Sequence, residues 1–189
     1  MANFFAILSM FAIFYMNNKV ADGLPSFGNA MDPIKFGLKM EKLTHLQVYW
    51  HDKPSGPVPT TILVASANFT NPTIGFGSII VIDDALTVGP ELDSELVGRA
   101  QGSYVLASLA GQPAAAVMSM TFAFTAGEYN GSSISIAGRN TVLSAVREMP
   151  ITGGTGVFRF ARGYVQLRTH FFDTNGDASV KYDIYALHY

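Results

Sequence analysis

The residues of this chain best suited to acid–base chemistry are carboxyl groups that stand beside apolar sequence. Asp52 follows the aromatic stretch Leu43–Trp50, so we expect its carboxyl group to lie close to an apolar pocket. Burial of that kind raises the pKa of a carboxyl group and makes it a competent general acid. The alternative interpretation is structural, with Asp52 accepting backbone hydrogen bonds in the turn that follows. His51 is expected on the opposite face of the same strand, away from Asp52.

Two adjacent acids and a tyrosine extend this candidate set. Asp83 and Asp84 stand side by side in the apolar stretch Ser78–Leu86. In a strand they point to opposite faces, so at most one of them enters the interior. Tyr104 lies in another predicted strand, where its phenol either orients a ligand or packs with its hydroxyl group hydrogen-bonded.

Arginines are concentrated in the glycine-broken segment Gly138–Tyr164. A buried arginine stays charged and needs a carboxylate, carbonyl or ligand oxygen as its partner. Arg139 and Arg147 therefore predict a site that grips an anionic or hydroxylated ligand, and the alternative is a set of surface arginines in salt bridges. Gly153–Gly156 lacks the lysine and the strand-to-helix context of a phosphate loop, and predicts a tight turn with positive φ.

Composition excludes several other kinds of chemistry. The chain has no cysteine, which excludes thiol catalysis and thiolate metal sites. His45, His170 and His188 are dispersed without metal-ligand spacing, so no metal site is predicted. A net charge of −2 gives no electrostatic footprint for nucleic acid.

The elements that must position these residues are short strands. Hydrophobic residues make up 49% of the 189 residues, which suffices for one buried core. Apolar stretches broken by turn residues, with no long helical period, predict an all-β fold of about eight antiparallel strands. An eight-stranded antiparallel barrel leaves an interior for side chains or one small ligand, and a two-sheet sandwich is the alternative. Hairpin turns are predicted at Asn130–Gly131 and Asp173–Asp177. The expected strand segments are Leu43–Trp50, Thr60–Ser66, Ser78–Leu86, Val97–Leu109, Ala115–Thr125, Ser132–Ala137, Phe158–Phe160, Tyr164–Phe172 and Ser179–Tyr189.

The N-terminal sequence resembles a targeting element. Phe4–Met16 is apolar but short for a membrane span, and Val20–Asp22 forms a small-residue cleavage site. We therefore predict a signal peptide over residues 1–22, a lead-in over 23–42 and one barrel domain over 43–189, with a membrane anchor as the alternative. The sequons at Asn68 and Asn130 are predicted glycosylation sites and fit secretion into the extracellular space, the apoplast.

Several motifs, taken in order, resemble those of plant dirigent proteins over roughly Leu43–Tyr189. The stretches that carry the resemblance are Tyr49-Trp50-His51-Asp52, Gly75-Phe76-Gly77, Val81-Ile82-Asp83-Asp84, Val97-Gly98-Arg99-Ala100-Gln101-Gly102, Gly153-Gly154-Thr155-Gly156 and Ala161-Arg162-Gly163. The resemblance implies an eight-stranded antiparallel barrel with a pocket at one end, and a secreted homotrimeric glycoprotein. It implies no cofactor and no metal. It also implies a phenolic ligand and a reactive intermediate of the quinone-methide type.

The same resemblance assigns site residues. It places the family's acids on Asp52 and Asp83, its pocket tyrosine on Tyr104 and its arginine on Arg147. Members that steer radical coupling to lignans carry an aspartate where this chain has Asn140, a departure that disfavours lignan formation.

The forms Gly138-Arg139-Asn140 and Val146-Arg147-Glu148-Met149 look more like the branch that includes the pterocarpan synthases. That branch implies a dehydratase that closes a ring in a 2′-hydroxyisoflavan-4-ol, an isoflavanol. The hypothesis makes Asp52, Asp83 and Arg147 catalytic, and Tyr104 and three further residues substrate-binding: Arg139, Asn140 and Phe172. Two alternatives stay open: a non-catalytic protein that steers oxidase-generated phenoxy radicals, and a phenolic-binding carrier without turnover.

Overall fold

The computed structural model describes residues 28–66 and 75–189. The predicted signal peptide over residues 1–22 and the sequon asparagine Asn68 lie outside these described residues. The chain divides into two units, Met1–Leu38 and Lys39–Tyr189. In the described part of the first unit, residues 33–37 form a turn, and the Asp32 carboxylate accepts a hydrogen bond of 2.9 Å from the backbone N–H of Ile34.

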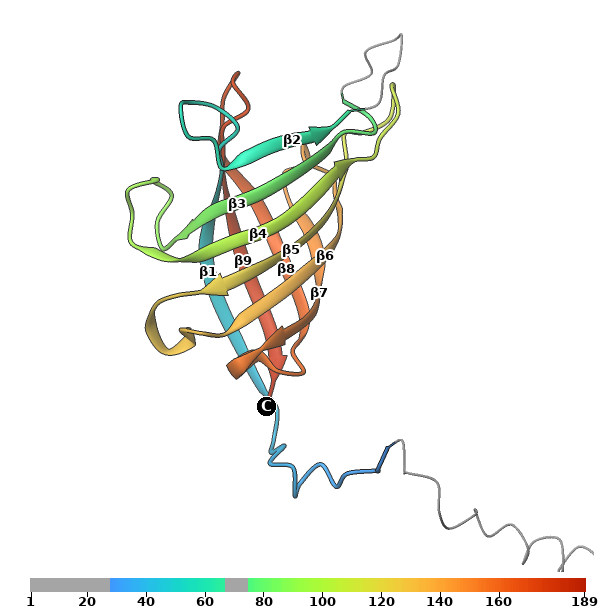
Figure 1. The fold of residues 1–189 in the computed structure, drawn as a ribbon, viewed down its shortest axis with the longest axis vertical. Helices are drawn as coiled ribbons and strands as arrows, with labels where there is room; N and C mark the ends of the chain where they lie inside the picture. The colour runs from blue at the N-terminus through green and yellow to red at the C-terminus, as the bar shows by residue number, and fades with distance from the viewer. Residues whose placement is uncertain (1–27, 67–74) are drawn as a thin grey trace, which may run out of the picture. The chain divides into compact units, whose positions relative to one another are not determined.

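The second unit is built from antiparallel strands and two short 3₁₀ helices (Figure 1). None of the helices in the described residues is long and apolar enough to cross a membrane. The strands are β1 (Lys42–Asp52), β2 (Thr61–Ala65), β3 (Ile79–Thr87), β4 (Leu96–Leu106), β5 (Ala116–Phe124), β6 (Ser133–Asn140), β7 (Arg147–Thr155), β8 (Arg162–Phe172) and β9 (Ala178–His188), and the 3₁₀ helices are η1 (Gly127–Tyr129) and η2 (Gly156–Phe158).

The sheet closes on itself into a barrel. Its strand order is β1-β9-β8-β7-β6-β5-β4-β3-β2, and an additional pairing of β1 with β3 closes the ring. Trp50 of β1 is consequently paired with Val180 of β9 on one side and with Leu86 of β3 on the other. Eight strands, β1 and β3 to β9, form the closed barrel, while β2 pairs with β3 outside the ring. The predicted eight-stranded antiparallel barrel is confirmed, and the sandwich alternative falls.

Alternation along each strand separates an inner from an outer face. In β3, Ile80, Ile82 and Leu86 are buried, while Ile79 and Val81, on either side of Ile80, are exposed on the outer face. Successive side chains of a strand point to opposite sides of the sheet, so the buried set faces the barrel interior. This alternation decides which polar side chains of each strand reach the interior.

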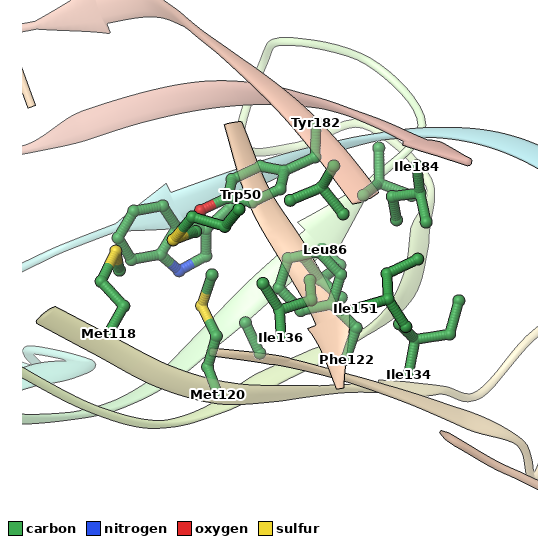
Figure 2. Close-up of a cluster of buried hydrophobic side chains, with 14 of the residues drawn as sticks. Trp50, Leu86, Met118, Met120, Phe122, Ile134, Ile136, Ile151, Tyr182 and Ile184 are labelled. Carbon is green, nitrogen blue, oxygen red and sulfur yellow. The ribbon is translucent and has the colours of Figure 1, made fainter. Parts of the chain in front are cut away.

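Aromatic and aliphatic side chains fill the middle of the barrel (Figure 2). The Tyr182 ring makes edge contacts with Phe122 and Trp50, with ring centroids 5.1 Å and 6.2 Å apart. Full burial of each such side chain contributes about 1.5–3 kcal/mol to stability. Trp50 and Met118 lie at one end of this cluster in Figure 2, and Asp52, two residues after Trp50, lies beyond that end at the last position of β1.

Rings pack together near the opposite end of the barrel. Phe158 of η2 is fully buried and stacks on Tyr129, with ring centroids 5.1 Å apart, and it also contacts the ring of His188. The His188 ring is hydrogen-bonded to the hydroxyl group of Thr44 over 2.8 Å. These contacts leave the other end of the barrel as the place for a pocket.

The segment Gly138–Tyr164 differs from the sequence-based expectation. Residues 147–155 form strand β7, in which Gly153 and Gly154 pair with β6, so the first glycines of the cluster are not in a turn. A side chain at Gly154 would come within 2.6 Å of the carbonyl oxygens of Ser133 and Phe158, which explains a glycine inside a strand. The tight turn comes later, at Gly156 with a φ of +61°, and Phe158 lies in η2 rather than in a strand.

Both predicted hairpin turns are present. Asp173–Asp177 joins β8 to β9, with Gly176 at a φ of +93°. Asn130–Gly131 lies between β5 and β6, where Gly131 has a φ of +80°. This second connection is longer than a two-residue turn because η1 precedes it.

Candidate functional site

A pocket of about 410 Å³ opens at one end of the barrel. Its lining comes from the ends of β1, β4, β6 and β8 and from the beginnings of β5, β7 and β9. In an antiparallel barrel these ends and beginnings meet at the same rim. Most of the lining is apolar, and its polar side chains include Asp52, Tyr104, Asn140, Arg147 and Thr169. Of the predicted site residues, Asp52, Tyr104, Asn140, Arg147 and Phe172 are thus brought together.

Asp52 lies at the end of β1 and turns its carboxyl group towards two hydroxyl groups. Thr61 Oγ1 donates a hydrogen bond to Asp52 Oδ1, and the Tyr104 hydroxyl group donates to Oδ2 over 3.2 Å. Burial raises the pKa of Asp52, and the two hydrogen bonds only partly oppose this shift. Burial also raises the pKa of the Tyr104 phenol, which therefore stays protonated. The burial of Asp52 at the pocket agrees with the sequence-based expectation, and its role as a general acid stays a prediction.

Asp84 is a buried acid that sequence reasoning left without a role. Its side chain is fully buried inside the barrel, and the Trp50 indole N–H donates to its Oδ2 over 2.7 Å. The hydroxyl group of Thr60 donates to Oδ1, and that of Thr61 lies 3.2 Å from the same oxygen. Burial, together with the nearby charge of Asp52, raises the pKa of Asp84 to about 7.

The placement of Asp83 in the pocket is wrong. Asp83 lies on the outer face of β3, with 56% of its side chain exposed, and pairs with Arg99 over 2.9 Å. That hydrogen bond holds the pKa of Asp83 below its ordinary value. The alternation of buried Ile80 and Ile82 with exposed neighbours assigns the interior position to Asp84. The sequence carries no such alternation, because residues 79–82 are all apolar, so it does not single out the inward-facing acid.

Arg147 is the cation of the pocket. Its side chain is 5% exposed and donates to the carbonyl oxygen of Val142 over 3.0 Å and to the hydroxyl group of Thr169 over 2.6 Å. Among the described residues no carboxylate pairs with it, and its buried Nε has no hydrogen-bond partner. Burial lowers the pKa of Arg147, but an arginine remains charged in a protein. The arrangement leaves the buried Nε–H as a donor without a partner in the described structure, in a side chain that lines the pocket.

Asn140 faces the same pocket and also carries an unsatisfied atom. Its Nδ2 donates to the Met118 sulfur over 3.1 Å, while its buried Oδ1 has no partner in the described structure. Phe172 lies at the rim, 64% exposed, as part of the lining. Arg139 does not fit the prediction: it is exposed on the outer face because it is adjacent to inward-facing Asn140 in β6.

Two further features bear on the earlier expectations. Asn130 is exposed in the connection between β5 and β6, so its side chain is accessible. In the described part of the chain, no group of three or more histidine, cysteine, aspartate or glutamate residues is placed to hold a metal ion.

The fold and site define the class of closed β-barrels with a pocket at one end, and comparison with known proteins makes this specific. A family model described as Dirigent-like protein matches residues 43–187. The chain belongs to the dirigent protein family.

Its relatives include proteins with different names. Dirigent protein 7 of Arabidopsis thaliana is 52% identical over 169 residues, covering 87% of each chain. Pterocarpan synthase 1 of Glycyrrhiza echinata is 48% identical over 167 residues, covering 87% of this chain and 88% of the relative. The solved structure of the pterocarpan synthase dirigent protein GePTS1 superposes with a TM-score of 0.74 at 49% identity, covering 80% of this chain and 87% of that one.

Proposed function

We propose that the protein is a pterocarpan synthase of the dirigent type, a hydro-lyase that acts on a 2′-hydroxyisoflavan-4-ol. The observation that carries the proposal is the shared pocket of Asp52 and Arg147, which joins a buried acid to a buried cation without a carboxylate partner in the described structure. The likeness to two pterocarpan synthases at 48% and 46% identity supports it.

In the first step Asp52 donates its proton to the leaving hydroxyl group. The carbon–oxygen bond breaks, and water departs with the bonding electron pair. The phenolic hydroxyl group para to that carbon passes its proton to solvent at the pocket rim, so the intermediate is a neutral quinone methide. Arg147 holds the phenolic oxygen through its free N–H and stabilises the charge that develops on it.

In the second step the 2′-hydroxyl oxygen attacks the same carbon. Its proton passes to the Asp52 carboxylate, and the quinone-methide oxygen takes a proton back from solvent at the pocket rim as the ring becomes aromatic again. The sum is the loss of one water, and Asp52 ends as it began. Apolar lining from Trp50, Met118 and Phe172 excludes the water that would otherwise trap the intermediate.

An assay with and without an oxidase tests this function. Purified protein is incubated with a 2′-hydroxyisoflavan-4-ol, and pterocarpan is measured by chromatography. Turnover without an oxidase is the expected result. A stereochemical bias in phenol coupling that requires an oxidase would instead indicate a radical-steering protein, and saturable binding without either product would indicate a carrier.

We also propose that the protein is secreted and works as a glycosylated homotrimer. The exposure of Asn130 supports glycosylation, and exposed apolar side chains on the outer face of β2, β3 and β5 support assembly: Ile62, Val81 and Val117. Light scattering of the protein before and after enzymatic deglycosylation tests the trimer and the glycosylation. A monomeric mass, or no mass loss on deglycosylation, would contradict the respective part.

A further inference from the structure

Thr61 stands between two carboxyl groups of the barrel interior. Its hydroxyl group donates to Asp52 Oδ1 and lies 3.2 Å from Asp84 Oδ1. Thr61 is itself 5% exposed, so water does not readily replace these contacts. One hydroxyl group therefore connects the acid of the pocket to the acid beneath it.

The single hydrogen of the Thr61 hydroxyl group restricts where a proton on Asp52 or Asp84 can lie. A hydroxyl group has one hydrogen to donate and two lone pairs that accept. When the Thr61 hydrogen goes to Asp52, a hydrogen bond between Thr61 and Asp84 exists only if Asp84 carries a proton and donates it. When the Thr61 hydrogen goes to Asp84, the proton must instead lie on Asp52. The two arrangements interconvert when the proton of Asp84 moves to the Thr61 oxygen and the Thr61 hydrogen moves to Asp52, or the reverse.

The remaining contacts favour a single proton on this pair. Asp84 Oδ2 accepts from the Trp50 indole and its Oδ1 from Thr60, while Asp52 Oδ2 accepts from Tyr104. The oxygen of each acid that faces Thr61 is its Oδ1. Two buried carboxylates in such proximity, without a cation, cannot both ionise cheaply. Among the described residues, no lysine, arginine or histidine forms an ion pair with either acid.

We propose that Asp52, Thr61 and Asp84 form a proton relay, in which Asp84 supplies a proton to Asp52 through the Thr61 hydroxyl group. Asp84 and Thr61 act through Asp52 and are therefore positioning residues. The catalytic part of this inference rests on the proposed function, whereas the shared proton does not. When Asp52 has protonated the leaving group, the pair is dianionic, which makes Asp52 a stronger base for the proton of the attacking hydroxyl group.

The other titratable groups around the pair do not interfere near neutral pH. Burial raises the pKa values of Tyr104 and Tyr182, so both phenols stay protonated. Hydrogen bonds from Ser55 and Lys53 lower the pKa of Asp177, which stays ionised. His51 lies on the opposite face of β1, where its ring is hydrogen-bonded to Thr87 and burial lowers its pKa.

Trp50 provides a direct probe, because it is the single tryptophan of the sequence and its indole N–H donates to Asp84. The indole N–H resonance is followed by NMR between about pH 4 and about pH 9, without any substrate. We expect a titration with a midpoint about 2–3 pH units above that of an ordinary aspartate. Asp84→Asn should abolish it, and the matched control Asp83→Asn, on the outer face, should leave it unchanged. A resonance that does not titrate, or that titrates equally in folded Asp84→Asn, would overturn the shared proton.

Two further variants test the coupling and keep the proposal testable if Asp84→Asn fails to fold. Asp52→Asn removes a neighbouring charge and should lower the indole midpoint, whereas Thr61→Val removes a donor and should raise it. Unchanged midpoints in both variants would contradict the coupling. These measurements need no turnover, so they can succeed even if the proposed lyase activity fails.

The relay itself is tested by activity. Thr61→Val, which keeps the shape but lacks the hydroxyl group, should lower kcat by about 10-fold or more and shift the pH profile, while Thr61→Ser should restore both. Wild-type kcat with a wild-type pH profile in folded Thr61→Val would overturn the relay.

Discussion

The Tyr104 hydroxyl group lies 3.2 Å from Oδ2 of Asp52 and donates its hydrogen to it. The contact fixes the orientation of the carboxyl group at the pocket, with its second oxygen held by Thr61. Both donors stabilise the ionised form of Asp52, but burial outweighs them and raises its pKa. Asp52 is thus held in place as an acid whose pKa lies above that of an ordinary aspartate.

Replacement of this acid should remove the chemistry but leave the barrel intact. We expect Asp52→Asn to lower kcat by about 10²- to 10⁴-fold, the usual contribution of a general acid, with little change in KM. The control is Asp83→Asn, because Asp83 is exposed on the outer face and should be dispensable. Retention of wild-type kcat by folded Asp52→Asn would contradict its role.

A second pair of variants compares Arg147, inside the barrel, with Arg139, on its outer face. Arg147→Met should lower kcat/KM by about 10²- to 10³-fold, since it removes the cation that stabilises charge on the phenolic oxygen. Arg139→Met should leave turnover unchanged because Arg139 is exposed outside the barrel. Arg147 also holds the carbonyl oxygen of Val142, so thermal unfolding is measured alongside the kinetics. Equal activity of the two variants would contradict the proposed position of the phenol.

The two adjacent acids and the two arginines show which features of the site can be predicted from the sequence. Alternation within strands predicts that only one of Asp83 and Asp84 faces inward, and the burial of Ile80 and Ile82 selects Asp84. The resemblance in motif order placed the catalytic acid on Asp83. A match along the sequence carries no information on which face of a strand a residue occupies. The same error placed Arg139 in the pocket.

Strand β7 was not predicted, for a different reason. Strand β7 contains Pro150, Gly153 and Gly154, residue types that usually interrupt strands, so its sequence indicates a loop. Tertiary contacts override that local preference: Gly154 lies so close to the backbone of Ser133 and Phe158 that only glycine fits. The hairpin at Asp173–Asp177 was predictable, since it depends on a local pattern. The strand count agreed only because the expected strand Phe158–Phe160, which is not a strand, offset the missing β7.

The buried acid Asp84 should make folding stability depend on pH. Its pKa rises from an ordinary value of 3.8 to about 7 on folding, so the folded state binds the proton more tightly than the unfolded state. The stability that this group contributes is present below about pH 4 and is lost as the pH rises through about 7, a total of about 4 kcal/mol at most.

Chemical denaturation across this range, in wild-type protein and in Asp84→Asn, measures that contribution. The difference in free energy of unfolding between the two should change in favour of the variant as the pH rises from about 4 to about 7 and then level off. Acids remote from the Asp52–Asp84 pair titrate equally in both proteins and cancel. A difference independent of pH would show that Asp84 is not protonated in the folded protein.

The pocket rim offers a prediction on substrate binding. Phe172 lies in the lining of the pocket, so Phe172→Ala should raise KM by about 10-fold through loss of apolar contact, with kcat nearly unchanged. Phe171→Ala is the matched control, since Phe171 is similarly exposed but belongs to a separate cavity beside His51. Steady-state kinetics of the two variants measure this KM, and an equal KM for both would show that Phe172 does not contact the substrate.

The central claim is that this pocket itself catalyses the loss of water from an isoflavanol, with Asp52 as the proton donor. The most direct measurement is the consumption of a racemic 2′-hydroxyisoflavan-4-ol by the purified protein without an oxidase, followed by chiral chromatography. We predict that the wild-type protein consumes one enantiomer preferentially and converts it into one pterocarpan, and that Asp52→Asn does not. Consumption at the rate of buffer alone, or equal loss of both enantiomers, would contradict the account.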